Sequence, residues 1–415
     1  MTILETQGLA ARHAERVLAV AGTAQKNRAL EAIARALKER ESAILAENQK
    51  DLAAARESGM KASLLDRLAL SPQRIDGIVE GVRQVAALPD PIGCVTRMEK
   101  RPNGLVIGKR RVPLGVIGII YEARPNVTVD AAALCLKSGN AVILRGGKEA
   151  FRSNKAFVAV MRDALEAAGL PRDCVALVED TSRASAQELM GLTGYLDVLI
   201  PRGGAGLIRT VVENARVPVI ETGVGVCHVY VDGEADLDMG ARILYNAKTS
   251  RPSVCNAIET ILVHEAAAER FLPLVKKKLD EKKVELHGDE KTRGILGGCV
   301  IPAAEEDWVK EYLDYKLAVR VVPSMEEALR HIARYSSGHS ECIITENYQK
   351  AREFTSRVDA AAVYVNASTR FTDGGEFGLG AEIGISTQKL HARGPMGLNE
   401  LTSMKFIVLG SGQIR

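Results

Sequence analysis

The sequence predicts an α/β fold made of parallel sheets covered by helices. Short runs rich in Val, Ile and Leu alternate with helical patterns, hydrophobic residues make up 46% of the chain, and aromatic residues make up only 4%. Cores of aliphatic side chains suit parallel strands, which are buried on both faces. At roughly 150 residues per domain, a chain of 415 residues suggests two or three domains.

Charge and cysteine content exclude several classes of protein. The 55 Lys and Arg residues nearly balance the 52 Asp and Glu residues, so we expect no basic surface that holds nucleic acid. The apolar stretch 112–121 is about half of a membrane span, and no signal peptide is visible. The seven cysteines include no Cys-x-x-Cys pair and no metal-ligand spacing. We therefore expect a cytoplasmic protein with reduced thiols and without metal, membrane or nucleic-acid partners.

The N-terminal region, residues 1–90, is expected to be helical, with Ser71 as the cap and Pro72 as the first residue of one helix. Residues 95–112 then predict a β-hairpin, because two strand-like runs flank the sequence Arg101-Pro-Asn-Gly104 and Asn-Gly is a strong hairpin signal. An isolated hairpin is marginally stable, so we expect it to pack on another surface, such as that of a second subunit.

Strands and helices alternate from residue 114 to residue 220. The expected strands are 114–121, 141–144, 175–178, 198–200 and 217–220, and the expected helices are 127–137, 153–168, 184–192 and 206–214. This order predicts a parallel sheet with right-handed crossovers. A second α/β unit begins near residue 229. Its expected strands are 258–263, 318–322, 342–345 and 362–365, and a glycine-rich tail ends in a strand at 406–409.

Loops that follow the strands are the candidate sites, because open α/β sheets bind ligands at the carboxyl ends of their strands. The sequence Tyr121-Glu-Ala-Arg-Pro-Asn126 places Arg124 and Asn126 at such an end. Asn126 either caps the helix 127–137 or offers its amide to a developing oxyanion. The loop Leu144-Arg-Gly-Gly-Lys-Glu149 combines glycines with two cations, which suits a phosphate or a nucleotide and equally an ordinary charged turn.

Two further loops contain glycines. Pro201-Arg-Gly-Gly-Ala-Gly206 would let the backbone approach a pyrophosphate at a helix N-terminus, although its spacing differs from G-x-G-x-x-G. Glu221-Thr-Gly-Val-Gly225 places a carboxylate after an expected strand, where it is a candidate general base. A structural turn is the competing interpretation of this second loop.

Cys255 is the candidate nucleophile. It lies just ahead of an expected strand, with Arg251 before it and Asn256 after it. A nearby cation and a following backbone amide favour a reactive thiolate. A lone cysteine is more often a small buried hydrophobic residue, which is the interpretation we give to the other six.

The order of these motifs resembles the aldehyde dehydrogenase superfamily: an Asn loop, a basic loop, a glycine loop, Glu-x-Gly, and a Cys 34 residues after the Glu. Within it, the sequences Tyr-Glu-Ala-Arg-Pro-Asn, Ile-Pro-Arg-Gly, Ile-Glu-Thr-Gly-Val-Gly and Arg-Pro-Ser-Val-Cys-Asn are similar to those of the gamma-glutamyl phosphate reductases. So are Ser337-Gly-His-Ser-Glu341 and Thr372-Asp-Gly-Gly-Glu-Phe-Gly378. The resemblance spans the whole chain. Val226 departs from the polar residue of that family, and we interpret it as a packing change beside a strand.

The resemblance implies an aldehyde dehydrogenase-like fold in three parts. These are a Rossmann-like NADP-binding domain (1–97 and 113–228), an α/β catalytic domain (229–365), and an oligomerisation element (98–112 and 385–415). It implies Cys255 as the nucleophile, Asn126 as the oxyanion donor and Glu221 at the position of the superfamily's general base. The implied cofactor-binding residues are Arg145, Gly146, Lys148, Arg202, Gly203, Gly204, Gly206 and Glu311, the last of which would hold the nicotinamide ribose. The implied substrate-binding residues are Arg124, Arg251, His339, Ser340, Phe377 and Gly378.

The implied activity is the NADPH-dependent reduction of L-glutamyl 5-phosphate to L-glutamate 5-semialdehyde in proline biosynthesis, with release of phosphate and through a thioester on Cys255. Lys148 favours NADPH over NADH, because a cation there would pair with the 2′-phosphate. Further copies of this chain and a glutamate kinase are the implied protein partners. Two alternatives remain open: a hydrolytic aldehyde dehydrogenase, in which Glu221 activates water, and a non-catalytic scaffold of the same fold.

Overall fold

The computed structural model describes the backbone of residues 1–415 and every side chain apart from those of residues 62 and 63. The chain forms two units. Unit 1 comprises Met1–Thr222, Gly378–Gly384 and Met396–Arg415, and unit 2 comprises Gly223–Phe377 and Ile385–Pro395. The domain boundary expected after residue 228 falls inside β7 (Cys227–Val231). This strand pairs in parallel with two strands of unit 2, so its hydrogen bonds tie it to that unit.

Unit 1 is built around a parallel sheet with the strand order β5-β4-β3-β6. Its strands are β3 (Val116–Tyr121), β4 (Ala141–Arg145), β5 (Val175–Leu177) and β6 (Val198–Arg202). They pair in parallel, as expected from the alternation of strands and helices. The strand expected at 217–220 is not formed, and Val219 forms an isolated bridge to Leu199 in its place. Pro218 lies within that run and has no amide hydrogen to donate to a ladder.

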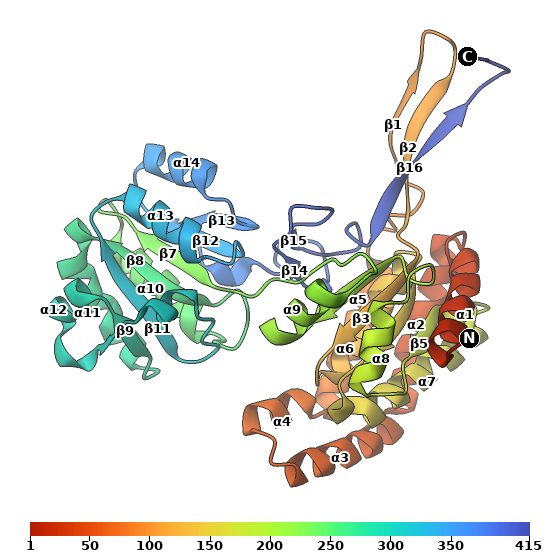
Figure 1. Ribbon diagram of the computed structural model, residues 1–415, viewed down its shortest axis with the longest axis horizontal. Helices are drawn as coiled ribbons and strands as arrows, with labels where there is room; N and C mark the ends of the chain where they lie inside the picture. The colour runs from red at the N-terminus through yellow and green to blue at the C-terminus, as the bar shows by residue number, and fades with distance from the viewer. The chain divides into compact units, whose positions relative to one another are not determined.

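Most helices of unit 1 flank this sheet, whereas the two helices of residues 41–68 lie beyond one end of it (Figure 1). The helices of this unit are α1 (Ile3–Leu18), α2 (Thr23–Glu39), α3 (Glu41–Glu57), α4 (Ala62–Leu68), α5 (Pro72–Ala87), α6 (Pro125–Lys137), α7 (Phe151–Ala167), α8 (Arg183–Met190) and α9 (Ala205–Asn214). The start expected for α5 is confirmed, because the Ser71 side chain accepts a hydrogen bond from the amide of Arg74 and Pro72 is the first helical residue. The helix α2 buries one apolar face with Leu30, Ile33 and Leu37, whereas α6 is buried on nearly all sides.

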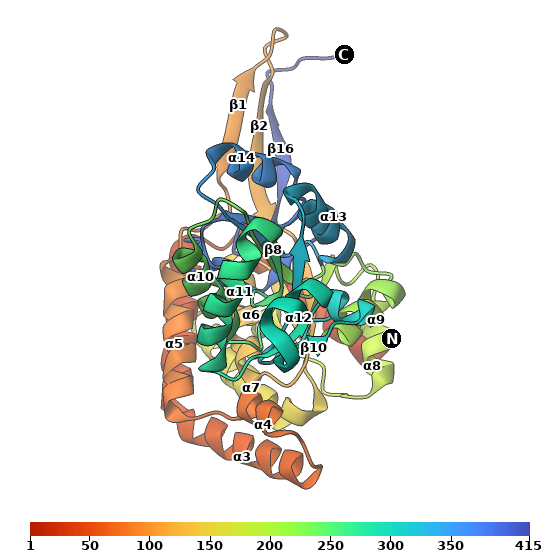
Figure 2. The same ribbon diagram turned by 90° about the vertical axis from the view of Figure 1, so that its left-hand side faces the viewer.

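A three-stranded antiparallel sheet also belongs to unit 1. It consists of β1 (Val95–Lys100), β2 (Val106–Pro113) and β16 (Thr402–Leu409) in the order β1-β2-β16. The expected hairpin is confirmed, and Gly104 provides the positive φ of 88° that its turn needs. Figures 1 and 2 show this sheet extending away from the helices of unit 1. It carries exposed apolar side chains, namely Val95, Met98, Phe406, Val408 and Leu409.

Unit 2 contains a larger parallel sheet with the strand order β10-β9-β11-β8-β7-β12-β13. The strands other than β7 are β8 (Ile258–His264), β9 (Glu285–Gly288), β10 (Ile301–Pro302), β11 (Lys316–Val322), β12 (Ser340–Ile344) and β13 (Ala362–Val365). The short strands β14 (Ile385–Ser386) and β15 (Gly394–Pro395) pair antiparallel. The helices are α10 (Leu237–Thr249), α11 (Glu265–Asp280), α12 (Glu290–Leu296), α13 (Met325–Tyr335) and α14 (Tyr348–Arg357).

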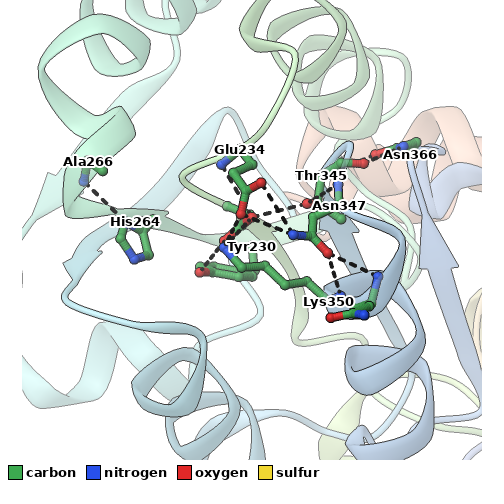
Figure 3. Close-up of polar contacts among 10 residues, drawn as sticks. Tyr230, Glu234, His264, Ala266, Thr345, Asn347, Lys350 and Asn366 are labelled. Atoms are coloured by element: carbon green, nitrogen blue, oxygen red, sulfur yellow. Dashed lines mark hydrogen bonds and ion pairs between the residues drawn. The ribbon is translucent and has the colours of Figure 1, made fainter.

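A buried carboxylate fastens α14 to the sheet of unit 2. Asp232 follows β7 and is fully buried, and it accepts hydrogen bonds from Lys350 of α14, Thr345 and the hydroxyl of Tyr230 at 3.0, 3.0 and 3.1 Å. Figure 3 shows Tyr230, Thr345 and Lys350 converging in this way. A buried charge is tolerated when it is paired and hydrogen-bonded in this manner. Within the described part of the chain, no helix combines the length and apolar character needed to cross a bilayer.

Candidate active site

The loops that follow β3, β4 and β6 leave the same edge of the unit 1 sheet. β4 and β6 flank β3, and all three strands are parallel. The loops beginning at Glu122, Gly146 and Gly203 are therefore neighbours. The structure thus places the Asn126 loop, the basic loop and the glycine loop side by side.

Asn126 lies inside α6 and does not cap it. Pro125 is the first residue of the helix and Arg124 is its N-cap residue. Proline fits this first position because its missing amide hydrogen would have no intrahelical acceptor there, so the capping role considered for Asn126 is wrong. Its exposed side chain instead donates a hydrogen bond from Nδ2 to Oδ2 of Asp130, at 2.9 Å. Burial raises the pKa of Asp130 to about 6, against the opposing effects of Asn126 and the Arg202 charge.

The glycine loop leads into an open helix N-terminus. Gly204 is the N-cap residue of α9, no side chain caps the helix, and residues 203–206 are exposed. A Cβ at Gly206 would meet nothing within 4 Å, whereas a Cβ at Gly203 would lie 2.7 Å from Cδ of Glu122. The Gly204 amide donates a 3.0 Å hydrogen bond to Oε2 of Glu122. An exposed helix N-terminus with an unobstructed glycine suits a diphosphate, so these residues fit a dinucleotide cofactor.

The two cations of the basic loop after β4 lie in different environments. Nη2 of Arg145 donates hydrogen bonds of 2.8 and 2.9 Å to the carbonyl oxygens of residues 181 and 182, so this guanidinium holds the loop that follows β5. Burial lowers the pKa of Arg145. A Cβ at Gly146 would overlap the side-chain amide of Asn154, so packing requires glycine there. The Lys148 side chain is exposed and accessible to a phosphate.

Cys255 lies in a turn just ahead of β8, and its side chain is half-buried. Arg370, which follows β13, interacts electrostatically with Cys255, and that interaction is attractive when the sulfur is a thiolate. The Arg370 guanidinium also donates hydrogen bonds to the side chain of Asn256 and, at 3.1 Å, to Oγ of Ser250. Arg251, the cation expected from the sequence, is exposed and repels Arg370.

Two carboxylates expected at the site belong to different units. Glu311 lies in unit 2 and is half-buried, and its Oε1 accepts a 2.8 Å hydrogen bond from the amide of Gly225. Burial raises the pKa of Glu311. Glu221 lies in unit 1, one residue before the end of its first segment, and is half-buried.

The residues expected to bind substrate differ in exposure. Arg124, Arg251, Phe377 and Gly378 are exposed. His339 and Ser340 are fully buried, and Nδ1 of His339 lies 2.8 Å from Oγ of Ser340. Burial lowers the pKa of His339 to about 4, so its ring is neutral near pH 7. These two side chains contact other protein groups in unit 2.

Three further side chains at these loops were not among the candidates, namely Glu122, Asp130 and Arg370. Asp130 could have been found, because it follows Asn126 by four residues on an expected helix and that spacing brings two side chains together. Arg370 lies far from Cys255 along the chain, and only the fold places it there. Among the described side chains, no group of three or more His, Cys, Asp or Glu residues is arranged to hold a metal ion.

Known proteins match this chain over its full length. A gamma-glutamyl phosphate reductase of Moorella thermoacetica is 64% identical over 99% of this chain and 98% of its own. One of Carboxydothermus hydrogenoformans is 63% identical over 98% and 97%. The crystal structure of gamma-glutamyl phosphate reductase from Thermotoga maritima matches with a TM-score of 0.98 and 52% identity, covering 100% of both chains.

More distant similarity extends to the wider fold. An acetylating aldehyde dehydrogenase of Geobacillus thermoglucosidasius, at 17% identity, has a TM-score of 0.71 over 99% of this chain and 97% of its own, which shows a shared fold. Residues 2–319 match the aldehyde dehydrogenase family. This chain therefore belongs to the aldehyde dehydrogenase family and, within it, to the gamma-glutamyl phosphate reductases.

Proposed function

We propose that this enzyme reduces L-glutamyl 5-phosphate to L-glutamate 5-semialdehyde, with release of phosphate, as a step of proline biosynthesis. The observation that carries this proposal is the 64% identity to a gamma-glutamyl phosphate reductase over 99% of the chain. The position of Cys255 supports it, because the residue lies in the turn just ahead of β8, a central strand of the unit 2 sheet.

Cys255 begins the reaction as a thiolate. Its sulfur attacks the acyl carbon, the bond between that carbon and the phosphate oxygen breaks, and inorganic phosphate leaves with the electron pair of that bond. A thioester on Cys255 remains. Negative charge develops on the former carbonyl oxygen during the attack. The side-chain amide of Asn126 and the backbone amide of Cys255 are the donors that stabilise this charge.

NADPH, when bound, supplies the hydride that reduces the thioester. We assign its diphosphate to the open N-terminus of α9 and its 2′-phosphate to Lys148, with Glu311 at the nicotinamide ribose. The residues of the cofactor site are Arg145, Gly146, Lys148, Arg202, Gly203, Gly204, Gly206 and Glu311. After reduction, the bond between the sulfur of Cys255 and the substrate carbon breaks, the aldehyde leaves and the thiolate returns.

Exposed guanidinium groups suit the anionic substrate. Arg124 in unit 1 and Arg251 in unit 2 can each form charge-assisted hydrogen bonds to a carboxylate or a phosphate. Phe377 and Gly378 belong to the glycine-rich segment that completes the substrate site. His339 and Ser340 are buried and would act on the substrate through other groups, such as Thr372, whose Oγ1 lies 2.7 Å from Oγ of Ser340.

Unit 1 is the cofactor-binding part, unit 2 is the catalytic part, and the sheet β1-β2-β16 is the oligomerisation element. Its exposed apolar side chains, among them Phe406 and Val408, support association with further copies of this chain. We propose a glutamate kinase as a second partner, since it supplies the labile acyl phosphate. All seven cysteines are free thiols, which supports a reducing, cytoplasmic location.

An assay of cofactor turnover in both directions tests this function. We expect oxidation of glutamate semialdehyde with NADP⁺ to require phosphate, and reduction of the acyl phosphate with NADPH to release phosphate in equal amount. Oxidation that proceeds equally well in phosphate-free buffer would identify a hydrolytic enzyme. The absence of turnover with competent cofactor binding would identify a scaffold.

A further inference from the structure

The carboxylate of Glu311 is engaged by the protein itself. Oε1 accepts the 2.8 Å hydrogen bond from the amide of Gly225. The loop that contains Gly225 is also held on its other side, because the amide of Val226 donates a 3.0 Å hydrogen bond to Oγ of Ser337. Glu311 and Ser337 thus fix two successive amides of one loop.

This loop lies directly against the backbone of the nucleophile. A Cβ at Gly225 would overlap the carbonyl group and the Cα of Cys255, so Gly225 touches that peptide. Two residues further on, Sγ of Cys227 donates a 3.2 Å hydrogen bond to the carbonyl oxygen of Cys255. The position of the Cys255 backbone therefore depends on the position of the loop 225–227.

A buried ion pair holds the segment that follows Glu311. Lys248 and Glu259 are both fully buried and lie 2.5 Å apart, and Lys248 also donates to the carbonyl oxygen of Ile258. Oε1 of Glu259 accepts a 3.2 Å hydrogen bond from the amide of Leu313, two residues after Glu311. Leu313 has a positive φ of 55°, a conformation that persists when the surroundings impose it. The charge of Lys248 also attracts the Glu311 carboxylate.

We propose that Glu311 is a positioning residue for Cys255, acting through the amide of Gly225. The buried Lys248–Glu259 pair holds the segment that carries Glu311, Glu311 holds the loop 225–227, and that loop holds the Cys255 peptide. The inference rests on the proposed function in one respect, namely that Cys255 is the nucleophile. It extends that function, because the ribose-binding role implied for Glu311 concerns the cofactor alone.

Three variants test the link in the full-length enzyme. Glu311→Ala removes the acceptor, Glu311→Gln keeps an oxygen that can accept from Gly225, and Glu306→Ala is the control, since Glu306 is an exposed carboxylate nearby in sequence. The measurements are kcat, the Kd of NADPH, and the rate at which iodoacetamide alkylates Cys255 without cofactor. Peptide mapping identifies the alkylated thiol.

We expect Glu311→Ala to lower kcat by about ten-fold to 100-fold, the scale for a displaced catalytic group. It should also slow the alkylation of Cys255 measured without cofactor, which a role in ribose binding alone would not do, and Glu311→Gln should restore most of both rates. A raised Kd of NADPH with unchanged alkylation would overturn the proposal in favour of a purely ribose-binding role.

Ser337→Ala removes the acceptor of the Val226 amide in the same loop without touching Glu311, and it serves if Glu311→Ala does not fold. It should slow alkylation with NADPH binding retained, and wild-type alkylation in both variants would overturn the proposal. Failure of the proposed function is distinguishable, because it would appear in the wild type as turnover without phosphate or as a different essential thiol.

Discussion

Asn126 and Asp130 form a hydrogen-bonded pair on one face of α6, with 2.9 Å between Nδ2 and Oδ2. An ionised carboxylate only accepts hydrogen bonds, so it orients the amide of Asn126 with the nitrogen towards Asp130. The second hydrogen of that nitrogen is then available for the oxyanion. The protonation state of Asp130 therefore bears on the group that we propose as the donor to the developing charge.

The activity of the wild type should fall as the pH drops through about 6, the raised pKa of Asp130. A protonated carboxyl can donate as well as accept and no longer fixes the amide. Asp130→Asn should lower kcat at pH 7 by about ten-fold, less than the loss of a whole oxyanion donor, and should remove this step from the pH profile. The control is Glu166→Gln, an exposed acid in the same unit. An Asp130→Asn profile that matches the wild type would contradict the role assigned to the pair.

The same pKa shift predicts an opposite effect on stability. The folded state keeps the Asp130 proton up to about pH 6, whereas an unfolded Asp loses it near its ordinary pKa of 3.8. The free energy of unfolding therefore falls as the pH rises from 3.8 to 6, and the ionised carboxylate remains unfavourable above that window. Asp130→Asn should raise Tm at pH 7 while it lowers activity. A lowered Tm at pH 7 would contradict this prediction.

Replacing the nucleophile should separate binding from chemistry. Cys255→Ser should lower turnover by roughly a thousand-fold or more, because the hydroxyl is a far weaker nucleophile than a thiolate. The Kd of NADPH should stay unchanged in fluorescence titration. Cys299→Ser is the matched control, since Cys299 is an exposed thiol of the same unit. Loss of turnover in a variant of Cys94, Cys135 or Cys227, with Cys255→Ser active, would show that the assignment is wrong.

Cofactor preference should depend on Lys148. Its exposed cation is available to pair with the 2′-phosphate that distinguishes NADPH from NADH. Lys148→Glu should raise the KM for NADPH by about ten-fold more than the KM for NADH, since a carboxylate repels the phosphate. Lys282→Glu makes the same charge change at an exposed position of unit 2 and should alter neither value. Equal losses with both cofactors would refute the assignment.

Glu221 should be dispensable in the phosphate-dependent reaction. Phosphate is a competent nucleophile at neutral pH, so no carboxylate base is needed, and an anion 4 Å from the incoming phosphate would cost about 4 kcal/mol at an effective dielectric near 20. We expect Glu221→Gln to keep most phosphate-dependent oxidation of the aldehyde, and the wild type to oxidise little without phosphate. Both are measured by absorbance of the reduced cofactor. The hydrolytic alternative would be favoured if Glu221→Gln were inactive and the wild type oxidised the aldehyde equally well without phosphate.

Local backbone preferences are the part of this fold that the sequence by itself determined. The hairpin around Gly104 and the start of α5 at Ser71 depend on residues within one turn, so they were predicted where the structure has them. Motif order also led to the prediction that Cys255 and Asn126 carry the chemistry, and these two roles stay predictions. The same local rules wrongly allowed Asn126 as a helix cap. The helix begins at Pro125, one residue earlier.

Tertiary structure alone decided which distant groups surround Cys255. Arg370 approaches it from the far end of unit 2, and Glu311 reaches Gly225 across 86 residues of sequence. The run 217–220 is another such case, since it lies beside the edge strand β6 and Val219 forms an isolated bridge to Leu199 in place of a full strand. These contacts depend on the spatial order of the strands and on which buried charges find partners. Local propensity and residue spacing predict neither the strand order nor the charge pairing. Both depend on packing between segments that are remote in sequence.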